Sequence, residues 1–157
     1  KNWMGLNWYW FGREWPYKNI KPRIIIEEFL PTKNNELPAD YKFYCFNGEP
    51  LYCQVIRGRG NNETIDFFDT EWNKMPFNGM RNLPMSNDNI EKPEHYSTML
   101  EFSRRLSKGI PFIRVDFYYV NKKIYFGELT LYPTSGYGEF KPKEWNEKLG
   151  NLMKIDL

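Results

Sequence analysis

Apolar residues along the chain fall into short runs with the alternation, or the dense β-branched and aromatic content, that is typical of strands. In the first half of the chain these runs are residues 23–30, 40–46, 51–56 and 64–69. The run at 23–30 has three consecutive isoleucines and ends at Pro31, which predicts a strand buried on both faces. Asn47-Gly48 follows the second run and predicts a tight hairpin, because both residues readily adopt positive φ.

A helix is predicted after residue 92. Pro93 suits its first turn, and Gly109 with Pro111 ends it. Its apolar stripe consists of Tyr96, Met99, Leu100 and Leu106.

Residues 113–133 predict two strands joined by a short turn at residues 121–123. Residues 143–153 predict a last amphipathic helix. Its apolar side carries Trp145, Leu149 and Leu152. The order of elements, strand, hairpin, strand, helix, hairpin and helix, predicts the α+β class: a mostly antiparallel sheet backed by helices.

The second hairpin carries polar residues at alternating positions. Arg114 and Asp116 share one face of its first strand, and Glu128 and Thr130 share one face of its second strand. A three-residue loop would place Asp116 and Glu128 on the same side of the sheet, whereas a two-residue loop would place them on opposite sides. The sequence alone leaves both arrangements open.

Two readings of these residues follow. If the two faces coincide, the carboxylates of Asp116 and Glu128 need a cation between them, and hard oxygen ligands suit Mg²⁺ that also holds phosphates. Arg114 could then bind a phosphoryl oxygen. The alternative is a surface hairpin whose acids pair with Arg114, Lys122 or Lys123, and spacing does not choose between the two.

Composition limits the classes of protein that fit. The 157 residues suffice for one domain or part of a larger one, and 18% aromatic residues supply a core despite a mean hydropathy of −0.72. Lysine and arginine number 22 against 20 acids, a net charge of +2 that does not suggest a nucleic-acid partner. No apolar run approaches the roughly 20 residues that a membrane span needs.

Cysteine and histidine are scarce. Cys45 and Cys53 lie in neighbouring predicted strands, where they could form a disulfide but more simply indicate buried thiols of a cytoplasmic protein. The single histidine, His95, lies at a predicted helix start, so hydrolytic chemistry that depends on histidine is not favoured.

Several of these segments together resemble a known family. Residues 23–30, taken with Arg114-Val-Asp116 and Gly127-Glu-Leu-Thr130, resemble the C-terminal half of an ATP-grasp fold. Further motifs narrow the resemblance to the TupA-like branch, which is associated with capsule and cell-wall polysaccharide gene clusters: Arg13-Glu-Trp-Pro-Tyr17, Tyr41-Lys-Phe43, Phe46-Asn-Gly48 and the segment from Phe126 to Pro133. The resemblance extends from about residue 8 to residue 149.

The resemblance implies a nucleotide site at the end of the first apolar run. Glu27, Glu28, Phe29 and Leu30 match the linker that holds adenine, whose free backbone groups can read the edge of the base. Asp40 matches an acid that often contacts the ribose hydroxyls. Each has a simpler reading, since an acid can blunt a strand end and Asp40 can be an ordinary loop residue.

The resemblance also assigns roles on the second hairpin. Asp116 and Glu128 match the family's metal-binding acids, and Arg114 matches a phosphate contact. Thr130 stands where many ATP-grasp enzymes have asparagine, so it is a weak metal ligand or only orients Glu128. Arg59 resembles a basic residue of a mobile loop that meets a carboxylate or acyl phosphate, with a solvated loop charge as the alternative.

The activity implied is a ligase reaction that joins a carboxylate to an amine through an acyl phosphate, with ATP and Mg²⁺ as cofactors and a carboxylate, amine or sugar-linked substrate. Residues 1–157 are expected to form one partial ATP-grasp domain, because the lysine-bearing strand that covers the triphosphate is not found among them. The oligomeric state is not predicted.

Two other classes of function stay open. One is an ATP-grasp remnant without catalytic activity that acts as a binding or structural module. The other is a carbohydrate-active enzyme that uses Asp116 and Glu128 as its acid pair, with tryptophans as stacking platforms.

Overall fold

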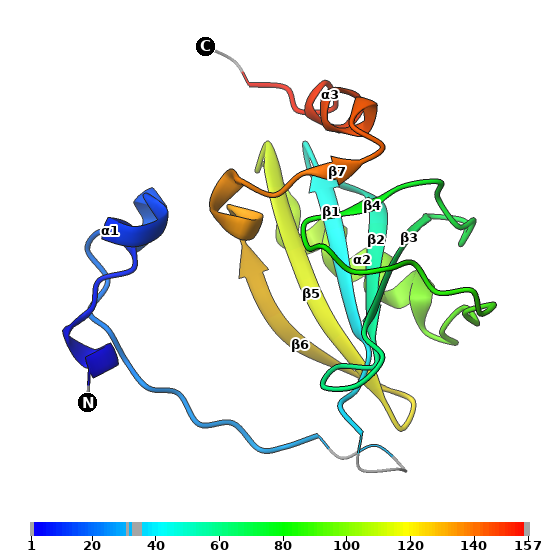
Figure 1. Ribbon diagram of the computed structural model, residues 1–157, viewed down its shortest axis with the longest axis horizontal. Coiled ribbons are helices and arrows are strands. Elements are labelled where there is room, and N and C mark those ends of the chain that lie inside the picture. The colour runs from blue at the N-terminus through cyan, green and yellow to red at the C-terminus, as the bar shows by residue number, and fades with distance from the viewer. Residues whose placement is uncertain (1, 31, 33–35, 156–157) are drawn as a thin grey trace.

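The computed structural model describes residues 2–30, 32 and 36–155, and a five-stranded antiparallel sheet forms its centre (Figure 1). The strands are β1 (Asp40–Phe46), β2 (Glu49–Arg57), β3 (Thr64–Asp69), β5 (Phe112–Val120) and β6 (Lys123–Thr130). Their order is β3-β2-β1-β5-β6, so β1 lies in the middle and β3 and β6 form the edges. Two short strands, β4 (Asn78–Gly79) and β7 (Phe140–Lys141), form a separate pair. The predicted α+β class is confirmed.

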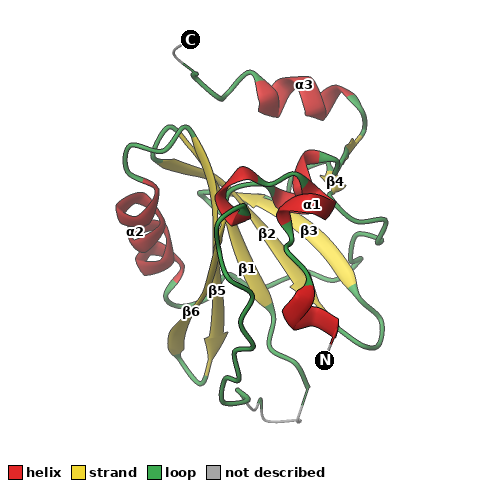
Figure 2. Ribbon diagram, turned by 90° about the vertical axis from the view of Figure 1, so that its left-hand side faces the viewer, coloured by secondary structure: helices red, strands yellow, loops and turns green. Residues whose placement is uncertain are grey.

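The helices lie on both sides of the main sheet (Figure 2). They are α1 (Tyr9–Gly12), α2 (Tyr96–Ser107) and α3 (Glu144–Gly150), with 3₁₀ turns at Asn2–Gly5, Trp15–Tyr17 and Pro133–Gly136. The longest, α2, packs on β1, β2 and β5, whereas α1 and α3 belong to the opposite side. In the part of the chain that the structure describes, no helix combines the length and the apolar character that crossing a membrane requires.

The face of the sheet under α2 is apolar. Met99 is completely buried between α2 and the sheet, in a cluster with Phe43 and Val115. The predicted apolar stripe of this helix is confirmed except at Leu106, which is 39% exposed. Beyond Met99 the buried side of the helix continues as serines, and Ser103 Oγ donates to the Met99 carbonyl at 2.8 Å. A hydroxyl that bonds its own helix backbone can be buried at little cost.

The opposite face is divided into two parts. One end is an aromatic cluster in which Phe140 of β7 and Leu149 of α3 pack on Tyr44 and Phe67. The predicted last helix is therefore confirmed, and its Leu149 is buried. The other end of this face carries charged side chains of β1, β5 and β6. Figure 1 shows that α3 does not extend over it.

The turn of the first hairpin is the one that its sequence predicts. Asn47 and Gly48 have φ of 51° and 87°, and Phe46 pairs with Glu49, so the loop has two residues as predicted. The two cysteines on these strands, Cys45 and Cys53, are free and buried.

The second hairpin combines a two-residue loop with a shift of register. Val120 pairs with Lys123, which by itself would place Asp116 and Glu128 on opposite faces. Between Phe117 and Val115, however, the pairing shifts by one residue, so that Arg114 pairs with Thr130. The shift lies at Gly127, where an added Cβ would be 3.1 Å from the Asp116 carbonyl oxygen, a close approach that favours glycine.

The strand predicted at residues 23–30 is wrong. The segment forms no regular element, and Ile24, Ile25 and Ile26 are 66%, 79% and 92% exposed. Among the described residues its backbone groups bond no other backbone group, and a strand without a neighbour has no ladder of hydrogen bonds to hold it. Pro31, predicted to end this strand, lies outside the described residues.

The contact between α2 and the sheet predicts a large effect of truncating Met99. We expect Met99→Ala to lower the free energy of unfolding by about 2–5 kcal/mol, because it leaves a cavity in a buried cluster. Arg105→Ala on the exposed side of the same helix is the control and should change it by less than about 0.5 kcal/mol. Urea unfolding followed by circular dichroism measures both, and equal effects would contradict this account of the core.

Candidate functional site

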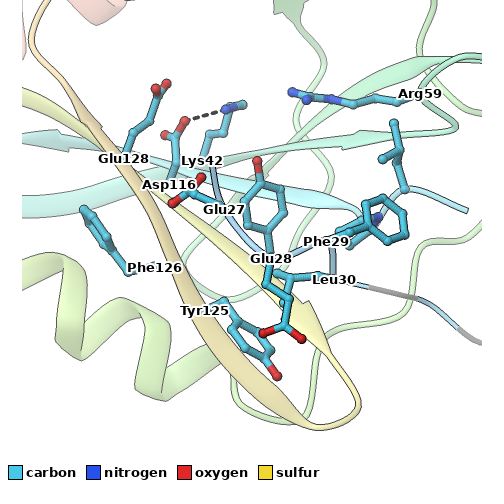
Figure 3. Close-up of a pocket in the computed structure, with 14 residues that line it drawn as sticks. Glu27, Glu28, Phe29, Leu30, Lys42, Arg59, Asp116, Tyr125, Phe126 and Glu128 are labelled. Atoms are coloured by element: carbon cyan, nitrogen blue, oxygen red, sulfur yellow. Dashed lines mark hydrogen bonds and ion pairs between the residues drawn. The ribbon is translucent and has the colours of Figure 1, made fainter. Parts of the chain in front are cut away.

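A cavity of about 760 Å³ lies over the charged end of the sheet (Figure 3). One wall is the extended segment Glu27, Glu28, Phe29 and Leu30, continued by Leu37 and Pro38. The opposite wall is the face of β1, β5 and β6, from which Lys42, Asp116 and Glu128 enter the cavity, with Arg59 at its edge. The fold thus brings the predicted adenine linker and the predicted metal acids to one cavity.

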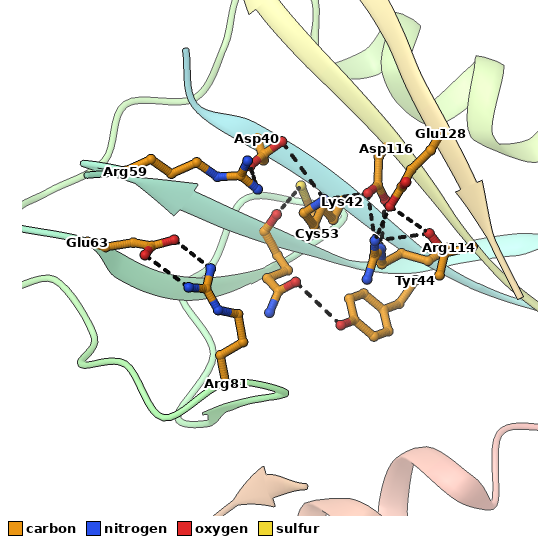
Figure 4. A network of polar contacts seen from close by, with 12 residues as sticks. Asp40, Lys42, Tyr44, Cys53, Arg59, Glu63, Arg81, Arg114, Asp116 and Glu128 are labelled. Carbon is orange, nitrogen blue, oxygen red and sulfur yellow. Dashed lines mark hydrogen bonds and ion pairs between the residues drawn. The ribbon is translucent and has the colours of Figure 1, made fainter. Parts of the chain in front are cut away.

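Charged side chains of alternating sign cross this face of the sheet as one row (Figure 4). We call it the charged row: Arg59, Asp40, Lys42, Asp116, Arg114 and Glu128, in order of contact. Each member contacts a neighbour of opposite sign within 4 Å, and Asp40 and Asp116 are almost fully buried. Burying a charge in this way is tolerated only when a partner compensates it.

Arg114 lies between the two acids of the second hairpin. Its Nε and Nη2 donate to the two oxygens of Asp116, both at 2.7 Å, and Nη2 also donates to Glu128 Oε1 at 2.8 Å. Thr130 Oγ1 accepts from the same Nη2 at 3.0 Å and donates to Glu128 Oε1 at 3.0 Å. Burial disfavours the charged guanidinium, but the hydrogen bonds and charge of Asp116 outweigh it and raise the pKa of Arg114.

Lys42 is a member of the site that sequence reasoning did not assign. Its Nζ forms an ion pair with Asp116 Oδ2 and lies 3.8 Å from Asp40 Oδ1, and its side chain is only 10% exposed. The alternation of β1 already puts Lys42 on the same face as Asp40. What the sequence could not supply is the neighbouring strand, since only the β1–β5 pairing sets Lys42 opposite Asp116.

Asp40 and Arg59 form the other end of the charged row. Arg59 lies in the loop after β2, and its guanidinium forms an ion pair with Asp40 Oδ2. Burial raises the pKa of Asp40, although the charges of Lys42 and Arg59 act in the opposite direction. Asp40 is 1% exposed and is not among the residues that line the cavity, whereas Arg59 and Lys42 are.

Asp116 and Glu128, the two acids that the sequence assigned to Mg²⁺, both line the cavity. Asp116 Oδ2 and Glu128 Oε1 both lie within 2.8 Å of Arg114 Nη2, so the guanidinium stands between the two carboxylates and a shared metal ion would have to take its place. Within the described ranges there is no cluster of three or more His, Cys, Asp or Glu that could form a cage from protein ligands alone. Mg²⁺ commonly takes one or two carboxylates and completes its shell with phosphate oxygens and water.

The bidentate contact predicts that Arg114 cannot be replaced by lysine without loss. We expect Arg114→Lys to lower the free energy of unfolding by about 1–3 kcal/mol, because an ammonium cannot bond both oxygens of the buried Asp116. Arg104→Lys is the control, since Arg104 pairs with Glu49 at 2.9 Å but is 47% exposed. Its expected change is below about 1 kcal/mol, and a loss at Arg104 that equals the loss at Arg114 in urea unfolding would refute the difference.

Comparison with models of known protein families gives a match that covers most of the chain. A family model described as TupA-like ATPgrasp matches residues 1–154 of the chain. The match covers the N-terminal segment as well as the sheet and α3, so it is not confined to a C-terminal part of the chain. No curated protein and no solved structure matches. Because the family match includes almost every residue, the cavity and its charged row included, the chain belongs to the TupA-like ATP-grasp family.

Proposed function

We propose that this chain binds Mg·ATP for a ligase that joins a carboxylate to an amine in polysaccharide assembly. The observation that carries the proposal is that the linker 27–30 and the acids Asp116 and Glu128 line one cavity, although about 90 residues separate them in sequence. Convergence of an unpaired backbone segment and a polar floor that offers both carboxylates and cations suits a ligand with an aromatic base and metal-bound phosphates.

Residues 27–30 would bind the base. Their backbone groups have no backbone partner among the described residues, so they are free to pair with the edge of a purine. Phe29 lines the cavity together with Tyr118 and Tyr125, and aromatic rings offer apolar surface to a planar ligand.

The charged row would bind the phosphates and the metal. Asp116 and Glu128 would hold Mg²⁺, and Thr130 would orient Glu128 through the hydrogen bond it donates. Lys42 lines the cavity and would offer its charge to phosphoryl oxygens, whereas Arg114 does not line it and would reach them only after releasing the acids with which it pairs. When bound, ATP would activate the acid as an acyl phosphate, which the amine attacks with loss of phosphate. The side chains of the site would orient these groups and offset their negative charge.

We also propose that residues 1–157 form the adenine and metal side of the site, and that turnover needs a covering half with further lysines. Lys18 does not fill this role, since its Nζ lies 4.3 Å from the ring centre of Trp15 and it is not among the residues that line the cavity. We further propose a cytoplasmic location. The proposed reaction consumes ATP, and the two cysteines are free thiols, and both features agree with it. Hydrolysis of carbohydrate finds less support, since no tryptophan is among the described residues that line the cavity.

The proposal predicts metal-dependent nucleotide binding that requires both acids. In calorimetric titration, the wild type should bind ATP only with Mg²⁺, and Asp116→Asn should lose most of this affinity. Glu128→Gln should lower it at least about tenfold, which corresponds to about 1.4 kcal/mol. Glu128 is 61% exposed at its side chain, so this variant is expected to fold.

Glu49→Gln is the matched control, because Glu49 is 60% exposed and also pairs with an arginine, but does not line the cavity. Its ATP affinity should equal that of the wild type. Binding that does not depend on Mg²⁺, or no binding by the wild type, would instead favour a non-catalytic binding or structural module.

A further inference from the structure

Asp40 lies beneath the cavity rather than in its wall. It begins β1, is 1% exposed, and does not line the cavity. Three residues around it do: Lys42, Arg59 and Tyr118. Lys42 and Arg59 contact its two carboxylate oxygens, and Tyr118 is the residue paired with Asp40 across β1 and β5. One buried carboxylate therefore touches or adjoins three groups that a ligand in the cavity would meet.

The contact with Asp40 is what holds Arg59 in place. Arg59 lies between Gly58 and Gly60, which have φ of 68° and 80° and give the loop a backbone that other residues rarely adopt. Among the described residues, the Nε atom of Arg59 has no hydrogen-bond partner. Within the same residues, its guanidinium forms a salt bridge with Asp40. A long side chain on such a loop loses much rotamer entropy when it becomes ordered, and a buried carboxylate can supply the compensating interaction.

Asp40 also balances the position of Lys42. The Nζ atom of Lys42 lies between Asp40 and Asp116, 3.8 Å from the former and in closer contact with the latter. Lys42 already donates to Asp116 Oδ2, and Asp40 is its second anionic neighbour, so loss of the Asp40 carboxylate would leave the ammonium to Asp116 alone.

We propose that Asp40 is a positioning residue that fixes Arg59 and Lys42 for the phosphate groups of the nucleotide. This inference rests on the proposed function, and it differs from a direct contact between Asp40 and the ribose. A ribose hydroxyl could reach the carboxylate only by displacing the cations above it, because Asp40 has almost no exposed surface. The negative charge of Asp40 disfavours a phosphate ligand, but it holds two cations in a fixed geometry before the ligand binds.

Three probes separate the possible roles: ATP, adenosine and inorganic triphosphate, each titrated with Mg²⁺ into the wild type and Asp40→Asn. The positioning role predicts that ATP and triphosphate bind about tenfold more weakly to the variant, whereas adenosine binding stays within about twofold. A ribose contact predicts the reverse pattern, with losses for ATP and adenosine and none for triphosphate. A merely repulsive carboxylate predicts tighter binding of both phosphate ligands, since its removal leaves the cavity more positive. Either of the last two results overturns the inference.

A second variant tests the same claim if Asp40→Asn fails to fold, which circular dichroism will show. Arg59→Gln changes a side chain that is 35% exposed and should weaken ATP and triphosphate but not adenosine. With Asp40→Asn folded, the double variant should lose less than the sum of the two single losses, because Asp40 acts in part through Arg59. Fully additive losses, or an Arg59→Gln variant that binds triphosphate as the wild type does, would overturn the inference. Absence of Mg-dependent ATP binding in the wild type is a different result, since it rejects the proposed function itself.

Discussion

Compensation of buried charge by alternating neighbours is the constraint on which the site depends. Asp40 and Asp116 are buried on one face of the sheet, and each would cost on the order of several kcal/mol if left alone. Lys42 lies between them, and Arg114 makes a bidentate contact with Asp116. The strands must therefore keep the register that brings these side chains together. The same contacts place cations and carboxylates within reach of a ligand, so stability and binding chemistry depend on one set of interactions.

The position of the cavity follows from how this face of the sheet is shared. Its aromatic end is covered by β7 and α3, which bury Phe140 and Leu149. An apolar layer over the charged end would bury its polar groups without hydrogen-bond partners, which is unfavourable. It meets instead the extended segment 27–30, whose backbone groups have no backbone partner in the described chain. A polar floor under an unpaired backbone segment is a surface suited to a polar ligand with a planar ring.

Much of the fold could be predicted from local patterns. The alternation in β1, β2 and β3, the Asn47-Gly48 turn and the last helix are determined by neighbouring residues, and the structure agrees with them. Residues 23–30 show where such patterns fail. A run of isoleucines favours an extended conformation, but a strand also needs a partner for its backbone, and the described chain brings none.

The sequence by itself determined which residue types the site would contain: Asp116 shares a strand face with Arg114, and Glu128 shares one with Thr130, because side chains alternate with period two. Whether the two faces coincide was decided by the tertiary structure, through a one-residue shift of register at Gly127. Pairing between distant strands also decided that Lys42 lies beside Asp116. Such pairings depend on long-range packing, which alternation along a single strand cannot encode.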